Sequence, residues 1–232
     1  MLITGASKGI GAAAARAFAA AGYQLLLLAR SGDALEELAA ELRSPQCRVE
    51  TASVDLADPR GIQAGLQDLL SRGLQPSVLI NNAGAAYTGN LAEMPLERWQ
   101  WLLQLNVTSV LQVCQAVLPA LRQQSGLIIN VSSHAARNAF PDWGAYCMTK
   151  AALASLSRCL AEEERQHGVR VSTLTLGAVN TPLWDSETVH SSFDRRAMLH
   201  PQRVAEALLS LAQQPSSQTV EDVTLMPAAG VL

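Results

Sequence analysis

The 232-residue chain lacks the features that mark membrane, secreted or nucleic-acid-binding proteins. Its longest run of large apolar residues, Leu25 to Ala29, is far too short to span a bilayer. No positively charged segment precedes an apolar stretch near residue 1, so we expect no secretory signal. The net charge of −3 gives no electrostatic reason to expect nucleic acid or an anionic membrane as a partner.

Cysteine and aromatic residues are also scarce. The four cysteines show no Cys-x-x-Cys spacing, and no metal site is predicted. We expect reduced, mostly buried thiols in a cytoplasmic protein. Aromatic residues make up 4% of the chain and hydrophobic residues 49%, which suits tightly packed helices on a sheet. The length fits one domain with a sizeable core, covering residues 1–232.

Lysine is rarer still. Of the 17 basic residues only two are lysines, Lys8 and Lys150. Lys8 lies in a glycine-rich stretch, and Lys150 follows a tyrosine by four residues. Because both lysines lie within motifs, both positions are candidate functional sites. At Lys150 in particular, a guanidinium would not replace a compact ammonium whose charge must lie against a phenol.

Patterns typical of strands and helices alternate along the whole chain. The expected strands cover residues 1–4, 24–29, 48–54, 77–81, 127–132, 169–176 and 223–226. The expected helices run from the glycine-rich stretch to residue 22 and over 33–43, 59–71, 95–124, 143–166 and 202–212. Asp33 and Glu36 indicate a capping box, and the long helix is expected to be interrupted around Asn106. This alternation predicts an α/β fold: a single-domain, Rossmann-type doubly wound parallel sheet of about seven strands, with helices on both faces.

A glycine-rich turn joins the first expected strand to the first expected helix. Gly5, Gly9 and Gly11 follow the spacing Gly-x-x-x-Gly-x-Gly. Glycines there permit a tight turn and close approach of the backbone to a pyrophosphate, whose charge the helix N-terminus favours. A purely structural turn is the alternative. The P-loop pattern is excluded because Lys8 precedes Gly9, so a dinucleotide is favoured over ATP.

The end of the second expected strand indicates which dinucleotide binds. Sites for NAD carry an Asp or Glu there, whereas this chain has Ala29, Arg30 and Ser31. Arg30, Ser31 and Lys8 offer cations and hydrogen-bond donors suited to a 2′-phosphate, so the sequence predicts NADP(H). The alternative is that Arg30 is an ordinary surface arginine.

Ser133, Tyr146 and Lys150 are the candidate reacting groups. Lys150 follows Tyr146 by four residues within an expected helix, so the two side chains should lie on the same face. The ammonium is expected to lower the Tyr146 pKa from its usual value of about 10. With the Ser133 hydroxyl beside it, such a phenol suits proton transfer to or from a carbonyl or alcohol, while another group supplies the electrons. For the spacing alone, a solvated helix face is the alternative.

Five motifs together resemble the short-chain dehydrogenase/reductase family, of its single-domain oxidoreductase kind. They are residues 4–11, the Asn-Asn-Ala-Gly stretch at 81–84, Asn106, Ser133, and Tyr146 with Lys150, in the family's order over nearly the whole chain. The resemblance implies a tetrad in which Tyr146 is the general acid/base and Lys150 lowers its pKa and holds the nicotinamide ribose. Ser133 would orient the substrate oxygen, and Asn106 would hold a water that links Lys150 to solvent.

The resemblance also implies an NADP(H) site. Its residues would be Gly5, Ser7, Lys8, Gly9, Ile10, Gly11, Arg30, Ser31, Asp55, Leu56, Asn82, Ala83, Gly84, Tyr146, Lys150, Gly177, Val179 and Thr181. Asp55 and Leu56 match the family's adenine contact, and residues 177–181 match the loop that holds the nicotinamide carboxamide. The chain departs from the family at Leu176, where a proline is usual, and in its shorter first strand, which leaves the true start of that strand open.

The substrate is expected at the carboxyl ends of the strands, in an apolar pocket with aromatic walls. The candidate wall residues are Tyr87, His134, Phe140, Trp143, Leu183 and Trp184, with Met198 as a further candidate. His134 is expected to line the pocket or point away rather than act as a base, because Tyr146 fills that role. The segment 181–200 is expected to be mobile. Simple loop packing is the alternative for each wall residue.

These residues predict NADPH-dependent reduction of a small-molecule ketone or aldehyde to an alcohol. One alternative is reduction of a 3-oxoacyl group on a carrier protein, whose acidic surface Arg137, Arg195 and Arg196 could meet. A non-catalytic NADP(H)-sensing protein is the less favoured alternative. The long helices at 95–124 and 143–166 resemble those that pair between subunits in this family, so a homodimer or homotetramer is expected.

Overall fold

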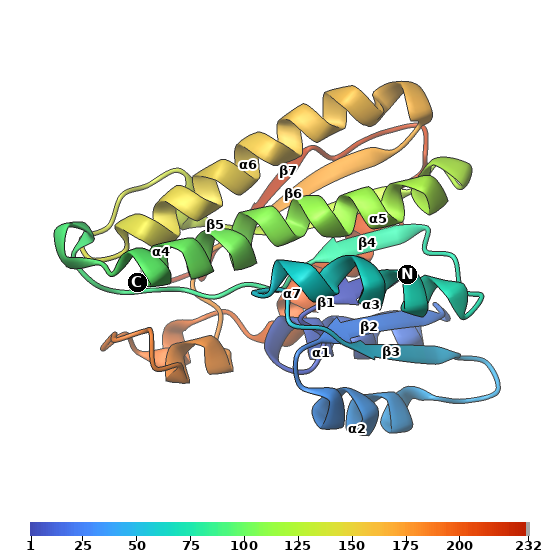
Figure 1. Cartoon of the computed structure of the whole chain (residues 1–232), viewed down its shortest axis with the longest axis horizontal. Helices are drawn as coiled ribbons and strands as arrows, with labels where there is room; N and C mark the ends of the chain where they lie inside the picture. Colours follow the sequence, from blue (N-terminus) through green and yellow to red (C-terminus); the bar gives the residue numbers. More distant parts are fainter. Residues whose placement is uncertain (231–232) are drawn as a thin grey trace.

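Seven parallel strands form one sheet through the centre of the molecule (Figure 1). The computed structural model describes residues 1–230. Within them the strands are β1 (Leu2–Thr4), β2 (Leu25–Ala29), β3 (Val49–Ser53), β4 (Val78–Asn81), β5 (Leu127–Ser133), β6 (Arg170–Leu176) and β7 (Asp222–Leu225). Their order is β3-β2-β1-β4-β5-β6-β7, and all neighbours are parallel. The predicted Rossmann-type sheet is confirmed, and its order reverses between β1 and β4, where such sheets bind ligands.

Helices cover both faces of the sheet (Figure 1). One face carries α1 (Gly9–Ala20), α2 (Gly32–Leu42) and α7 (Pro201–Ala212). The other carries α3 (Pro59–Ser71), α5 (Ser109–Gln123) and α6 (Gly144–Glu164), with α4 (Leu96–Leu103) leading into α5. Short 3₁₀ helices lie in the connections at Leu91–Glu93, His134–Ala136, Arg165–His167, Pro182–Asp185 and Arg195–Ala197.

The leucine run of β2 shows why both faces need a helical layer. Leu25 and Leu27 belong to the apolar core under α1, α2 and α7, whereas Leu26 and Leu28 belong to the core under α3, α5 and α6. All four side chains are fully buried. A continuous apolar run is typical of a parallel strand that is covered on both sides, and the sequence therefore indicated this strand correctly.

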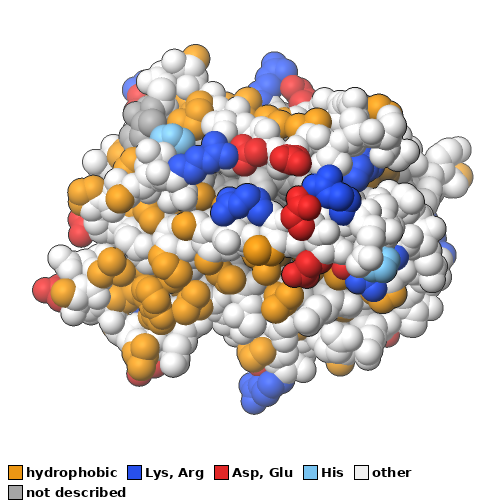
Figure 2. Space-filling model, turned by 90° about the horizontal axis from the view of Figure 1, so that it is seen from above, with side chains coloured by type: hydrophobic (Ala, Val, Ile, Leu, Met, Phe, Trp, Pro, Cys, Tyr) orange, Lys and Arg blue, Asp and Glu red, His pale blue; other side chains and the backbone are white. Residues whose placement is uncertain are grey.

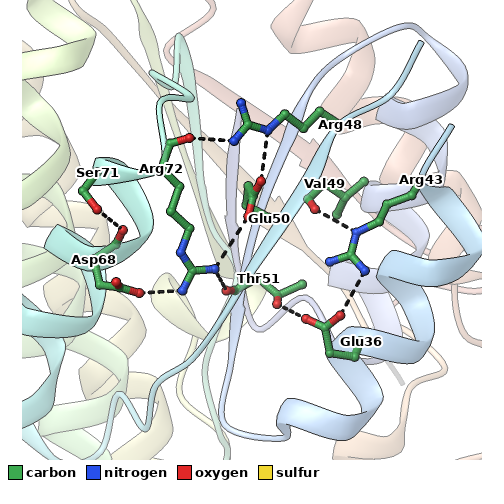
Figure 3. Close-up of polar contacts among 9 residues, drawn as sticks. All are labelled: Glu36, Arg43, Arg48, Val49, Glu50, Thr51, Asp68, Ser71 and Arg72. Carbon is green, nitrogen blue, oxygen red and sulfur yellow. Dashed lines mark hydrogen bonds and ion pairs between the residues drawn. The ribbon is translucent and has the colours of Figure 1, made fainter. Parts of the chain in front are cut away.

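Charged side chains cover the outer edge of β3, the last strand on its side of the sheet (Figure 3). The Arg43 guanidinium donates to the Val49 carbonyl oxygen at 3.0 Å, and Arg72 donates to the Thr51 carbonyl oxygen at 2.8 Å. Both acceptors are backbone groups of β3. These contacts occupy carbonyls that could otherwise pair with the edge strand of another molecule.

The capping box predicted for α2 is wrong. The helix begins one residue earlier than expected, at Gly32, and Ser31 is its N-cap residue. The Glu36 carboxylate, which would have bonded the backbone in such a box, instead accepts hydrogen bonds from Arg43 and from the Thr51 hydroxyl (Figure 3). Glu36 therefore bonds to Arg43 and to Thr51 of β3 rather than to the backbone of α2. The local sequence pattern could not show these contacts.

The interruption expected near Asn106 is a π-helical turn, Gln104–Thr108, between α4 and α5. π turns insert one residue into an α-helix and occur frequently at functional sites. The continuous helical stretch Leu96–Gln123 is long and apolar enough to cross a membrane by length and composition alone. However, Val113, Val117 and Leu121 are fully buried under the sheet, which is the packing of a core helix.

Candidate active site

One cavity of about 890 Å³ lies along the carboxyl ends of the strands. Residues at or directly after the ends of all seven strands line it: Gly5, Arg30, Val54, Asn82, Ser133, Gly177 and Met226. Its volume falls within the range of about 300–1,000 Å³ that is usual for ligand and cofactor pockets. The cavity therefore occupies the place that the topology of the sheet predicts for a ligand.

The glycine-rich turn forms one end of this cavity and is held by the side chain of Asn82, the residue directly after β4. Gly5 and Gly9 have positive φ angles of 65° and 57°, a conformation that glycine adopts without strain. The Asn82 amide donates to the Thr4 and Gly5 carbonyl oxygens at 3.0 and 3.2 Å. A Cβ atom added at Gly5 would lie 2.9 Å from the Ala83 Cα atom, so the turn packs directly on the loop after β4.

The predicted cofactor residues share this cavity, with one exception. All of them line it except Gly11. A Cβ atom added at Gly11 would overlap the Gly5 carbonyl oxygen, so this glycine closes the turn from behind. Gly11 therefore supports the turn, and its contact with the cofactor stays a prediction.

The charged groups at this end fit a nucleotide phosphate. Lys8, Arg30 and Ser31 line the cavity and are exposed. Neither Lys8 nor Arg30 takes part in an ion pair within residues 1–230. The backbone amides at the start of α1 add further donors. Two unpaired cations beside a helix N-terminus suit the phosphates of a dinucleotide.

Tyr146 and Lys150 lie on one face of α6, as their spacing predicted. The Lys150 Nζ atom is 5.8 Å from the centroid of the Tyr146 ring, and both residues line the cavity. Lys150 is buried, with 7% of its surface exposed, and its ammonium donates to the Val131 carbonyl oxygen at 3.0 Å. This hydrogen bond links the Lys150 side chain of α6 to β5, the strand that ends in Ser133.

The direction predicted for the Tyr146 pKa is wrong for this structure. Burial raises the pKa of Tyr146 to about 12, and the nearby Ser133 side chain only partly opposes that rise. Burial also lowers the pKa of Lys150 to about 8. The cost of burying the phenolate therefore determines the direction of the shift. At neutral pH the site holds a neutral phenol, which can donate a proton, beside a lysine that is mostly protonated.

Asn106 lies behind these residues rather than in the cavity lining. Its amide nitrogen donates to the Ala85 carbonyl oxygen at 2.8 Å and to the Thr149 hydroxyl at 3.0 Å, and its carbonyl oxygen accepts from the Ala85 amide at 2.9 Å. A Cβ atom added at Gly84 would lie 3.2 Å from Asn106 Oδ1 and 3.8 Å from Lys150 Nζ. The π-helical turn thus places Asn106 close to Lys150 and fixes the loop after β4.

Most of the predicted substrate-pocket residues line the cavity. They are His134, Phe140, Trp143, Leu183 and Trp184. Tyr87 and Met198 do not line it, so the structure gives these two predictions no support. Tyr87 packs on its own loop, where a Cβ atom added at Gly89 would lie 3.0 Å from its ring, and Met198 is buried with 8% exposed. The sequence reasoning missed Trp101, Leu105, Pro141, Glu187, Phe193 and Met226, which also line the cavity.

The segment 181–200, which was expected to be mobile, is hydrogen-bonded to its surroundings at its middle and in its second half. The Thr188 carbonyl oxygen accepts from the Thr88 amide at 2.9 Å, and the Thr188 hydroxyl donates to the Ala86 carbonyl oxygen at 2.8 Å. The Arg195 guanidinium donates to Asn180 Oδ1 at 2.8 Å and to the Thr181 carbonyl oxygen at 3.0 Å. These contacts hold the segment over the cavity.

Comparisons with known proteins agree with this geometry. A family model described as short chain dehydrogenase matches residues 1–191. An uncharacterized oxidoreductase of Staphylococcus saprophyticus is 32% identical, over 97% of this chain and 96% of the relative. Sepiapterin reductase of Chlorobaculum tepidum is 30% identical, over 99% and 96%. The structure of an alcohol dehydrogenase of Thermococcus sibiricus complexed with 5-hydroxy-NADP matches with a TM-score of 0.89 and 32% identity, over 98% and 95%.

Proposed function

Because the chain belongs to the short-chain dehydrogenase/reductase family of NAD(P)(H)-dependent oxidoreductases that act on CH–OH groups, we propose that it reduces a ketone or aldehyde to an alcohol with NADPH. One observation carries the proposal. Ser133, Tyr146 and Lys150 come from two elements and meet in the cavity whose other end is the glycine-rich turn. A panel of aryl ketones, diketones and 3-oxoacyl thioesters, assayed by NADPH oxidation, tests it.

Tyr146, Ser133 and Lys150 each have a separate role in the reduction of the carbonyl group. Bound NADPH supplies the hydride. Tyr146, neutral at pH 7 with a pKa of about 12, donates a proton to the carbonyl oxygen. The Ser133 side chain, beside the phenol, hydrogen-bonds the same oxygen and orients it. The Lys150 ammonium stabilises the phenolate that remains after the proton has left.

The rate of reduction is expected to fall as the pH rises through about 8. Burial lowers the pKa of Lys150 from 10.5 to about 8, so its positive charge is present below that pH and lost above it. A neutral amine no longer stabilises the phenolate of Tyr146. The measurement is kcat for carbonyl reduction at saturating NADPH as a function of pH. A rate that stays constant through pH 8 would contradict this role for Lys150.

We propose NADP(H) rather than NAD(H) as the cofactor. The support is the pair of free cations, Lys8 and Arg30, at the cavity end next to β2. Structures of two similar proteins contain the same dinucleotide: a metagenomic short-chain oxidoreductase in complex with NADP, and L-sorbose reductase of Gluconobacter frateurii with NADPH and L-sorbose. Titration of the purified protein with NADPH and NADH, followed by fluorescence, measures the preference.

Replacing Arg30 by glutamate is expected to reduce the preference for NADPH over NADH by roughly 10- to 100-fold, because a charged hydrogen bond to the 2′-phosphate is replaced by repulsion. The control is Arg158→Glu, the same change of charge at an exposed position of α6 outside the cavity. The ratio of the two dissociation constants is measured for both variants. An unchanged ratio in R30E would show that Arg30 does not contact the cofactor.

The alternative substrate, a 3-oxoacyl group on a carrier protein, has less support. A 3-ketoacyl-(acyl-carrier-protein) reductase of Brucella melitensis matches with a TM-score of 0.87 and 25% identity. However, the three arginines that could have met an acidic carrier are already paired: Arg137 with Asp222 at 2.7 Å, Arg195 with Asp185 at 2.8 Å and Arg196 with Asp194 at 3.2 Å. Competition by acidic carrier protein would separate the two substrates. The paired Tyr146 and Lys150 give no support to a cofactor sensor without catalysis.

We also propose a cytoplasmic homodimer or homotetramer with no nucleic-acid or membrane partner. Three exposed leucines would be covered between subunits: Leu91 in the short helix before α4, Leu96 in α4 and Leu111 in α5, at 54%, 63% and 39% exposed. Figure 2 shows hydrophobic side chains gathered on one side of the upper face, beside a region of mixed charge. Sedimentation of the purified chain measures its oligomeric state.

A further inference from the structure

The aromatic residues of this chain are concentrated in one place. Ten residues of the whole chain are Trp, Tyr or Phe, in numbers 4, 3 and 3. Six of them line the cavity: Trp101, Phe140, Trp143, Tyr146, Trp184 and Phe193. An apolar pocket needs only aliphatic side chains, and these are abundant here. A cavity that gathers most of a scarce residue type is therefore suited to a ligand that aromatic rings recognise.

Four of these rings form a continuous row that starts at the reacting phenol. The rings of Tyr146 and Trp143 have centroids 5.7 Å apart at 70°, Trp143 and Trp184 are 5.7 Å apart at 60°, and Trp184 and Phe193 are 5.7 Å apart at 75°. We call Tyr146, Trp143, Trp184 and Phe193 the aromatic row. Each contact has the edge-to-face or tilted geometry that aromatic pairs prefer.

The inner part of the aromatic row is fixed to the elements that build the site. The Trp184 indole nitrogen donates to the Val179 carbonyl oxygen at 2.8 Å, in the loop after β6. Trp143 is the N-cap residue of α6, and its carbonyl oxygen accepts from the Cys147 amide at 2.9 Å. Phe193, by contrast, is 39% exposed at the outer end. The two tryptophans therefore present preformed surfaces at a set position relative to Tyr146.

The charges around the aromatic row do not suit an anionic substrate. Among the described residues that line the cavity, the cations are Lys8, Arg30 and Lys150, and the first two lie at the glycine-rich end. Among the described residues that line the cavity, the acidic residue close in sequence to the row is Glu187, whose side chain is 80% exposed and lies 3.6 Å from Arg98. Lys150 lies at the reacting phenol, where the carbonyl oxygen must bind. A carboxylate or phosphate placed along the two tryptophans would meet no further cation among the described residues that line the cavity there, and would lose its hydration without compensation.

We propose that the substrate is an uncharged aryl ketone or aryl aldehyde, and that Trp143 and Trp184 are the residues that select it. The proposal rests on the carbonyl reduction proposed above. Because the Trp143 ring contacts the Tyr146 ring, an aryl group attached directly to the carbonyl carbon can pack on the tryptophans while the oxygen meets Tyr146. The planar aryl ring displaces water from the surfaces of the two tryptophans, which are already fixed. Its binding therefore orders few protein side chains.

A pair of ketones that differ only in the ring tests this selection. Acetophenone and cyclohexyl methyl ketone have the same carbon skeleton, but only the first has a planar π system. We expect kcat/KM to favour acetophenone by roughly 2- to 12-fold for each aromatic contact that forms. Trp143→Leu should bring the ratio close to one, and Trp143→Phe, which keeps a ring, should restore most of it. Trp99→Leu is the control, because Trp99 does not line the cavity.

A binding measurement separates failure of this selection from failure of carbonyl reduction. Calorimetry on the complex with NADP⁺ compares 1-phenylethanol with 1-cyclohexylethanol and needs no turnover. Tighter binding of the phenyl compound, lost in W143L and kept in W99L, supports the proposal even if no carbonyl in the panel is reduced. Equal or undetectable binding of both alcohols overturns it, while reduction of small aliphatic carbonyls would leave the proposed function intact.

Discussion

Replacing Tyr146 by phenylalanine is expected to lower kcat for carbonyl reduction by roughly 10²- to 10⁴-fold, the usual contribution of a positioned general acid. The phenol is the neutral proton donor of the cavity, with a pKa of about 12. Phenylalanine keeps the ring, and so keeps the packing on Trp143 at 5.7 Å, but removes the hydroxyl. Affinity for NADPH, measured by fluorescence titration, should be almost unchanged.

The matched control is Tyr23→Phe. Tyr23 loses the same hydroxyl, but its ring packs on Phe18 at 5.0 Å and it does not line the cavity. We expect Y23F to keep the rate of the unchanged protein. Substantial activity in Y146F would exclude Tyr146 as the proton donor. Equal losses in both variants would show that removal of a hydroxyl damages the fold rather than the chemistry.

The second large effect is expected for Gly11→Ala. The added Cβ atom would overlap the Gly5 carbonyl oxygen and lie 2.8 Å from the Asn82 amide nitrogen, so the glycine-rich turn must move. Overpacking of this kind destabilises a protein by about 1–3 kcal/mol. Because the moved turn no longer fits the dinucleotide, we expect NADPH affinity to fall roughly tenfold or more, equal to about 1.4 kcal/mol or more. Urea unfolding and fluorescence titration measure the two effects.

Gly61→Ala is the control for this change. Gly61 lies in α3, and no atom lies within 4 Å of a Cβ atom added there. Alanine is favoured over glycine in a helix by up to about 1 kcal/mol, so this variant should be equally or more stable and should bind NADPH normally. Stability and affinity that remain unchanged in G11A would show that the turn is looser than the contacts around Gly5 and Asn82 indicate.

The sequence indicated the fold well because its signals are local. The apolar run of β2 and the proline at the start of α3 fall within single elements, and α3 has the expected bounds, Pro59–Ser71. The capping box of α2 failed because Glu36 meets Thr51, a residue that only the folded sheet brings near. Boundaries and caps depend on such distant partners, whereas the type of an element mostly does not.

In the candidate site, too, the features that depend on local geometry were predicted and those that depend on distant partners were not. The four-residue spacing of Tyr146 and Lys150 fixed their common face, because helix geometry alone determines it. The pKa of Tyr146 is raised rather than lowered as predicted, because burial by neighbouring elements is the dominant cause. The spacing of residues in a sequence does not show how deeply a side chain is buried. Phe193 was missed since it meets Trp184 from a loop without a regular pattern. The scarcity of aromatic residues was the one signal that could have indicated these positions.

Carbonyl reduction is tested most simply by the rate at which the purified protein oxidises NADPH in the presence of the carbonyl panel. We expect that NADPH is consumed, that one alcohol forms for each NADPH oxidised, and that NADH supports a much lower kcat/KM. Binding of NADPH without turnover of any carbonyl would contradict it, because Ser133, Tyr146 and Lys150 would then meet in the cavity without the reaction that their arrangement supports.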